Sequence, residues 1–215
     1  MQCRSVESLS TFLTKIMKIY LGVLCAAVLT GIYKCYSFSN TSDNYNSQTV
    51  FLQADFMMFI IDLAHIFFAA FVFINFLRLI YRIGFNLTKK HNIVLTNTPG
   101  WTVGYFFIPI LNLYEPYVAI RELLDKMKES KFIDIKLLNY WWALWIISTI
   151  MSIILANYAI NRFGKSNDAL LNMMYLIYDS FNILLTVVWI KFIQTLSKAY
   201  NDKYVSKTTA DNSVN

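Results

Sequence analysis

Four long apolar blocks constrain the fold of this chain more than any other feature of its sequence. They lie at about residues 16–36, 56–80, 138–160 and 170–196. A helix needs ~20 residues to cross the hydrocarbon core of a bilayer, and each block is at least that long. Only 15% of the residues are charged, against ~25% in soluble domains, so few charges are left to cover the blocks. The sequence therefore predicts an all-α protein, an integral membrane four-helix bundle.

We expect a single four-span membrane domain over residues 1–200, followed by a polar cytoplasmic tail over residues 201–215. The first block could instead be a secretory signal peptide, because Lys15 and Lys18 precede its apolar middle. We favour a membrane span, because the apolar run continues to Tyr33 and no small-residue cleavage site precedes polar sequence.

Small residues recur at four-residue spacing in two of the blocks. One set is Gly22, Ala26 and Thr30, and the other is Ser148, Ser152 and Ala156. Such a stripe lets the backbones of two membrane helices approach closely. We therefore expect both stripes to face neighbouring helices.

A stretch between the second and third blocks, residues 98–129, is too interrupted by proline to form a membrane span. Pro109 and Pro116 each remove a helical hydrogen bond. Thr98 and Pro99 suit the N-cap and first position of a short helix. The residues after Pro116 form an amphipathic helix, which is typical of the membrane–water interface. We expect the stretch to enter the membrane as a re-entrant segment or to lie along its surface.

The distribution of basic residues predicts the orientation of the chain. The loop over residues 37–55 contains no Lys or Arg, whereas nine lie between Arg78 and Lys136. Short loops rich in basic residues stay in the cytoplasm, so the central region and both termini are placed there. This basic, amphipathic face would contact the lipid bilayer, anionic lipid in particular, and a protein partner or a homo-oligomer is also open. Nucleic acid is not expected as a partner, since no basic face is interleaved with exposed aromatic residues.

Polar residues inside the apolar blocks are candidates for an ion or proton site. Asp62 and His65 share one helix face, and Asp179 and Asn182 share another. On translocon scales an Asp at the centre of a span costs ~2.5–3.5 kcal/mol. We favour hydrogen bonding between helices, in which His65 and Asn182 satisfy the carboxylates. The alternatives are a proton or cation relay and a metal site of Asp62, His65 and Asp179, which lacks a ligand signature.

The central stretch reads PGWTVGYFFIPILNLYEPYVAIREL, where two prolines coincide with Asn-Leu and Pro-Tyr pairs. The motif positions are Pro99, Gly100, Trp101, Pro109, Asn112, Leu113, Pro116, Tyr117, Glu122 and Leu123. They resemble the signature of the bacterial membrane-protein family catalogued as domain of unknown function 4328. The resemblance extends more weakly from about Phe56 into Trp141-Trp142, and Tyr105-Phe106-Phe107 stands where a Trp pair is usual. It implies a several-span protein of the bacterial cytoplasmic membrane and implies no activity.

The sequence favours a non-enzymatic function. It contains no GxSxG, HExxH, P-loop or GxGxxG motif, so we expect no enzyme, no cofactor and no metal. The function predicted first is a membrane scaffold or accessory subunit. The alternative is a small transporter or channel that uses the intramembrane groups Asp62, His65, Asp179 and Asn112, since broken helices line substrate paths in transporters. An intramembrane enzyme is the last alternative.

Overall fold

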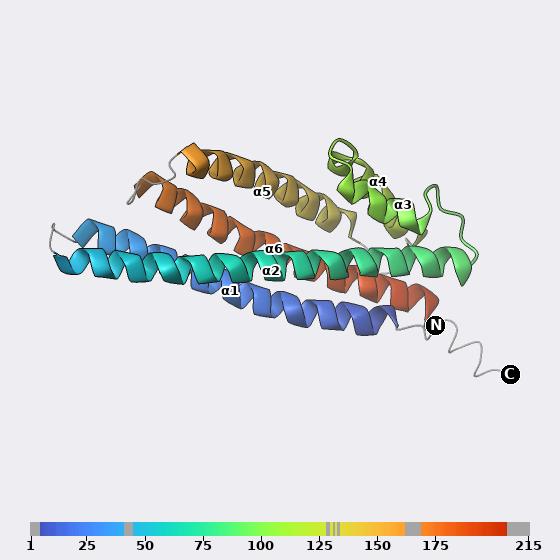
Figure 1. The fold of residues 1–215 in the computed structure, drawn as a ribbon. Helices are drawn as coiled ribbons and strands as arrows, with labels where there is room; N and C mark the ends of the chain where they lie inside the picture. Colours follow the sequence, from blue (N-terminus) through green and yellow to red (C-terminus); the bar gives the residue numbers. More distant parts are fainter. Residues whose placement is uncertain are drawn as a thin grey trace. The chain divides into compact units, whose positions relative to one another are not determined.

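The computed structural model describes residues 5–40, 45–127, 130, 132, 134–161 and 169–205. Within these ranges every regular element is helical, which confirms the predicted all-α class (Figure 1). The α-helices are α1 (Val6–Asn40), α2 (Tyr45–Lys89), α3 (Pro99–Gly104), α4 (Glu115–Lys126), α5 (Ile135–Asn161) and α6 (Ala169–Tyr204). Two 3-10 helices, η1 (Tyr105–Phe107) and η2 (Leu111–Leu113), lie between α3 and α4.

Four of these helices, α1, α2, α5 and α6, are long and apolar enough to cross a membrane, and the chain is therefore a membrane protein. Each helix extends beyond its apolar block. With 45 residues, α2 is ~68 Å long at ~1.5 Å per residue, against ~30 Å of bilayer hydrocarbon. Hydropathy marks the part of a helix that lipid can cover, whereas the helical hydrogen bonds continue into the flanking polar residues.

Two predicted segments, the tail over residues 201–215 and the central stretch over residues 98–129, have ends that the structure places elsewhere or does not describe. The predicted tail over residues 201–215 begins inside α6, which continues to Tyr204. Residues 206–215 of that tail lie outside the described residues, and so do residues 128–129 at the end of the central stretch.

The helices form two compact units, each built from several parts of the chain. One consists of Met1–Ile16, Phe71–Trp142 and Val188–Asn215, and we call it the aromatic unit. The other consists of Met17–Ala70 and Ala143–Val187, and we call it the polar-core unit.

The aromatic unit has a tightly packed core of ring side chains. The Trp141 ring stacks on Phe192, with ring centroids 5.1 Å apart and planes 9° apart. Phe76 packs against Trp141 and Trp189, with a centroid distance of 5.3 Å to each. Each buried aromatic ring removes ~150–250 Å² from water or lipid, so this cluster dominates the packing of the unit.

The central stretch, which belongs to the aromatic unit, is broken where the prolines predict. Thr98 caps α3, with its side-chain oxygen accepting from the Trp101 amide at 3.4 Å. Pro109 lies between η1 and η2, and Pro116 lies in the first turn of α4.

The apolar face of α4 is covered by protein, whereas the sequence suggested that it would face the membrane–water interface. Ile120, Leu124 and Met127 are buried inside the protein and do not form a lipid-facing surface. An amphipathic pattern predicts that one face is covered, but it does not say whether protein or lipid covers it.

The polar-core unit differs from the aromatic unit in that a carboxylate side chain lies among its buried residues. Its large exposed side chains are apolar, as shown by Ile66 and Phe67 on α2 and Ile153 on α5. Its buried side chains include Asp179 and Asn182 of α6. This arrangement suits a protein surrounded by hydrocarbon.

The prediction that the stripe of Gly22, Ala26 and Thr30 faces a neighbouring helix is wrong among the described residues. Gly22 and Ala26 are exposed, and a Cβ atom built on Gly22 would have no neighbour within 4 Å. Gly31 makes the close approach instead, since its Cβ would lie 3.4 Å from Leu176 of α6. Four-residue spacing aligns small side chains on a face, but the choice of face depends on the neighbouring helix.

Candidate functional site

A pair of carboxylates is the most unusual feature of the polar-core unit. Asp62 of α2 and Asp179 of α6 lie within range of mutual electrostatic interaction. Asp179 is only 5% exposed, and Asp62 is partly buried. No hydrogen bond to either carboxylate is present among the residues that the structure describes. Both residues belong to helices long and apolar enough to cross a membrane.

Other ionisable side chains surround this pair. Lys34 of α1 lies within electrostatic range of Asp62, and Tyr175 of α6 lies within range of both carboxylates. All four groups belong to the polar-core unit. The carboxylates therefore lie in a cluster of groups that can carry charge or move protons.

His65 does not serve as a hydrogen-bond partner of the carboxylates. Its Nε2 atom lies 3.0 Å from the hydroxyl oxygen of Tyr20, a buried residue of α1. The imidazole also stacks on Tyr178 of α6, with ring centroids 6.4 Å apart and planes 6° apart. His65 thus connects three helices through two tyrosines, which corrects the expectation that it satisfies Asp62 or Asp179.

Asn182 is also bound elsewhere. The Ser148 hydroxyl of α5 donates to the Asn182 side-chain oxygen at 3.0 Å. The Asn182 amide donates to the Tyr178 backbone carbonyl at 2.9 Å. Interhelical hydrogen bonding therefore accounts for the side chain of Asn182, and no hydrogen bond among the described residues joins it to Asp62 or Asp179.

The predicted alternative of a metal site gains no support from the geometry. Among the described residues, no three His, Cys, Asp or Glu side chains lie close enough together to hold a metal ion. Two carboxylates in an apolar medium repel each other, and one proton or one small monovalent cation between them relieves the repulsion. The pair is therefore suited to binding a single positive charge.

The family motif occupies a different place in the chain and makes structural contacts in the aromatic unit. Glu122 of α4 accepts hydrogen bonds from the Thr96 amide at 2.7 Å and the Thr96 hydroxyl at 2.9 Å. Tyr117 donates to the Asn139 side chain at 2.8 Å, and its ring packs on Trp142. These contacts connect α4 to the connector after α2 and to the start of α5.

The remaining motif residues shape the turns of the central stretch. A Cβ atom on Gly84 of α2 would lie 3.4 Å from Pro99, so the glycine allows α3 to begin close to α2. The side-chain oxygen of Asn112 is buried without a hydrogen-bond partner in the described structure. Trp101, Pro109 and Leu113 are exposed, Pro116 is buried, and Gly100 lies in the first turn of α3.

Sequence reasoning missed Tyr20, Tyr178 and Lys34. None of them shares a short spacing with Asp62 or His65, and each lies on a helix far along the chain. The sequence signal that could have identified them is a hydroxyl or an ammonium group within an apolar block.

Comparison with known proteins identifies a family. The model of a family described as Domain of unknown function (DUF4328) matches residues 43–198. No curated protein and no solved structure matches the chain.

Proposed function

Since the chain belongs to the DUF4328 family, whose description gives no activity, we propose from its own residues that it is a small membrane transporter for protons or a monovalent cation. The proposed binding site is the Asp62–Asp179 pair. We therefore rank a transporter above the membrane scaffold, which the sequence alone favours. The observation that carries the proposal is the burial of Asp179, which is 5% exposed in a helix long and apolar enough to cross a membrane, with no hydrogen bond to its carboxylate among the described residues.

A carboxylate inside a membrane helix is costly unless protein groups or a bound cation compensate its charge. A buried charge without a partner is strongly unfavourable, and carboxylates kept inside membrane helices commonly lie on ion or proton pathways. If the pair existed only to hold helices together, its oxygens would accept hydrogen bonds, as the side chain of Asn182 does. Tyr20 and His65 add two further groups that can exchange protons within the same unit.

Reconstituted liposomes with a trapped pH-sensitive dye test this proposal. With a potassium diffusion potential imposed, the wild-type protein should acidify or alkalinise the lumen faster than empty liposomes do. Asp179→Asn should slow the flux about tenfold or more, which corresponds to ~1.4 kcal/mol in the barrier. Replacing the other salts with choline separates proton movement from that of sodium.

The matched control is Asp125→Asn, which removes an exposed carboxylate from α4. It should leave the flux at the wild-type rate. A wild-type flux equal to that of empty liposomes, or an Asp179→Asn flux equal to that of wild type, would contradict transport through this pair.

A specific observation also favours the second candidate, a scaffold or accessory subunit that contacts lipid or a protein partner with its central stretch. The segment from the end of η1 to the start of α4 exposes Phe107, Ile110 and Tyr114, and Ile110 is 83% exposed. Exposed apolar side chains gathered in one segment are typical of a membrane-contacting surface.

A cysteine-free background allows this surface to be tested with an environment-sensitive dye. Ile110→Cys and Val94→Cys are a matched pair, because both side chains are 83% exposed. In liposomes containing phosphatidylglycerol, dye at position 110 should report an apolar environment and dye at position 94 an aqueous one. Equal spectra at the two positions would show that the turn does not enter the membrane.

We further propose that the protein lies in the bacterial cytoplasmic membrane with both termini in the cytoplasm. The nine basic residues between Arg78 and Lys136 support this orientation. A membrane-impermeant maleimide should label Ser42→Cys in intact cells and Val94→Cys only after permeabilisation. The reverse pattern would overturn the orientation.

A further inference from the structure

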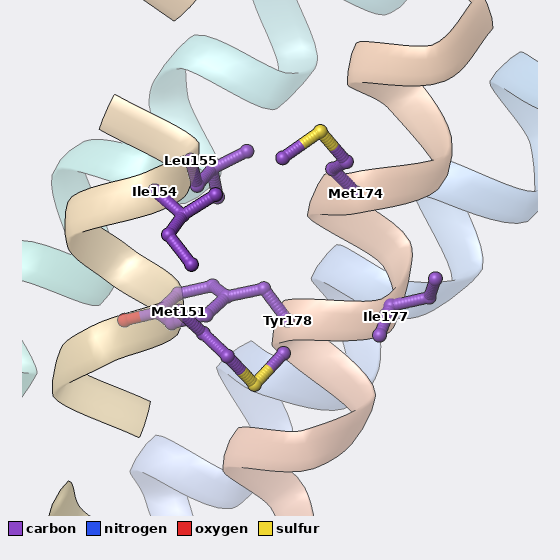
Figure 2. A pocket seen from close by; sticks show the side chains of 6 residues that line it. All are labelled: Met151, Ile154, Leu155, Met174, Ile177 and Tyr178. Atoms are coloured by element: carbon purple, nitrogen blue, oxygen red, sulfur yellow. The ribbon is translucent and has the colours of Figure 1, made fainter. Parts of the chain in front are cut away.

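The polar-core unit contains a small apolar pocket between α5 and α6. Its volume is about 120 Å³, and no polar atom contributes to its accessible lining. The lining residues are Met151, Ile154 and Leu155 of α5 and Met174, Ile177 and Tyr178 of α6, and the Tyr178 ring extends toward α5 (Figure 2).

The chemistry of the pocket selects an alkyl chain. Both of its helices are apolar enough to cross a membrane, and the lining residues Ile154 and Ile177 are exposed. The medium at its mouth is therefore lipid hydrocarbon. An apolar cavity of ~150 Å³ stays free of water and binds benzene or xenon, so a pocket of similar size accepts a short stretch of methylene groups. Met151 and Met174 can adjust to the shape of such a ligand.

The pocket also has a direct connection to the polar side chains of the same unit. Tyr178, which lines it, stacks on His65 with ring planes 6° apart. The Nε2 atom of His65 also lies 3.0 Å from the hydroxyl oxygen of Tyr20. A ligand that packs against Tyr178 therefore restricts the ring on which the imidazole lies.

We propose that this pocket binds one alkyl chain of a membrane lipid and that the bound chain holds Tyr178 in its stacked position on His65. Binding of the alkyl chain stands independently of any transport activity. Only the consequence for the Asp62–Asp179 pair rests on the proposed function. In that case a membrane lipid acts as a ligand that regulates the transport site.

Photolabelling tests the binding step. The full chain is placed in nanodiscs that contain phosphatidylglycerol with a diazirine in one acyl chain, and adducts are mapped by mass spectrometry. Labelling should concentrate on the pocket-lining residues. Ile154→Trp, which fills the pocket from its rim, should lower this labelling about tenfold, equivalent to ~1.4 kcal/mol of binding free energy.

The matched control for the filled pocket is Ile153→Trp. Residues 153 and 154 are neighbours on α5, with 56% and 55% of their surfaces exposed, and only residue 154 lines the pocket. Ile153→Trp should keep the labelling of the wild-type protein. Labelling spread evenly over the lipid-facing residues, or lowered equally by both substitutions, would overturn the proposed site.

The coupling to His65 has a spectroscopic readout of its own. The chain contains two histidines, His65 in the polar-core unit and His91 in the aromatic unit. In a sterol-type detergent, which lacks a linear alkyl chain, n-decane should saturably shift the ¹⁵N-imidazole signals of His65 but not those of His91. Ile154→Trp should abolish the shift, and Ile153→Trp should retain it.

Shifts that do not saturate, or that appear equally for both histidines, would overturn the coupling. Neither the labelling nor the spectrum depends on ion flux. An inactive transporter with specific labelling would therefore contradict the proposed function and still support the lipid site. An active transporter without specific labelling would overturn the lipid site alone.

Discussion

The aromatic unit and the polar-core unit differ in the side chains that mark their interiors, although α1, α2, α5 and α6 each contribute residues to both. In the aromatic unit the rings of Trp141 and Phe192 lie inside. In the polar-core unit Asp179 and Asn182 lie inside, and residues such as Phe67 face outward. The difference shows that the medium around a helix, protein or lipid, decides which of its faces is buried. Where hydrocarbon is the solvent, exposed apolar surface costs nothing and buried polar groups carry the specificity.

Replacing a ring in each unit should give the largest contrast between them. Trp141 is 1% exposed and packs against Phe76, Phe192 and Trp189. Trp141→Ala should lower the free energy of unfolding by ~3–5 kcal/mol, because it leaves a large cavity. Phe67→Ala, at a lipid-facing position, should cost far less. Thermal unfolding in detergent measures both, and equal losses would show that the two cores do not differ in this way.

Two substitutions to leucine sharpen the comparison inside the polar-core unit. Asn182→Leu removes the acceptor of the buried Ser148 hydroxyl and should cost ~1–3 kcal/mol. Asp179→Leu removes a buried carboxylate that has no described hydrogen bond, so stability should stay the same or rise. The measurement is the melting temperature in one detergent. If Asp179→Leu melts as early as Asn182→Leu, the carboxylate is a structural group and the transport proposal loses its main support.

A smaller effect is expected where the central stretch begins. Thr98 accepts a hydrogen bond from the Trp101 amide and caps α3. Thr98→Ala should lower stability by ~1 kcal/mol, the usual cost of losing an N-cap, whereas Thr98→Ser should keep the cap. Thermal unfolding of the two variants tests the assignment. Equal melting temperatures would show that the proline-broken stretch contributes no local stability to the aromatic unit.

The long spans, the proline breaks and the Thr98 cap could be predicted because each depends on local sequence. The close approach of Gly84 to Pro99 could not be predicted, since it depends on how two separate elements meet. For the candidate site, short spacing identified Asp62 and His65 as neighbours. It could not identify Tyr20 as the partner of His65, because that contact joins positions 45 residues apart. Periodicity predicts which residues share a face but not what lies opposite that face.

The smallest expected effect concerns His91, which lies outside the membrane-spanning segments and at the edge of the aromatic unit. Its ring packs on Tyr204 with centroids 4.4 Å apart, and its Nε2 lies 3.4 Å from the Tyr200 hydroxyl. Burial and then the charge of Lys90 lower the pKa of His91 below its ordinary value of 6.5. The unfolded chain therefore takes up a proton before the folded chain does. The contribution of the neutral ring is fully present above that value and is lost as the pH falls below it.

Acidification should consequently destabilise the wild-type protein more than His91→Gln, which keeps a polar side chain but does not titrate. Melting temperatures of both proteins, measured in one detergent from neutral to mildly acidic pH, give the difference. Groups in the polar-core unit titrate in both proteins, so their contribution cancels in this difference. A wild-type protein that gains stability in acid relative to His91→Gln would mean that the imidazolium is favoured, and that the packing of His91 against Tyr200 and Tyr204 does not exclude charge.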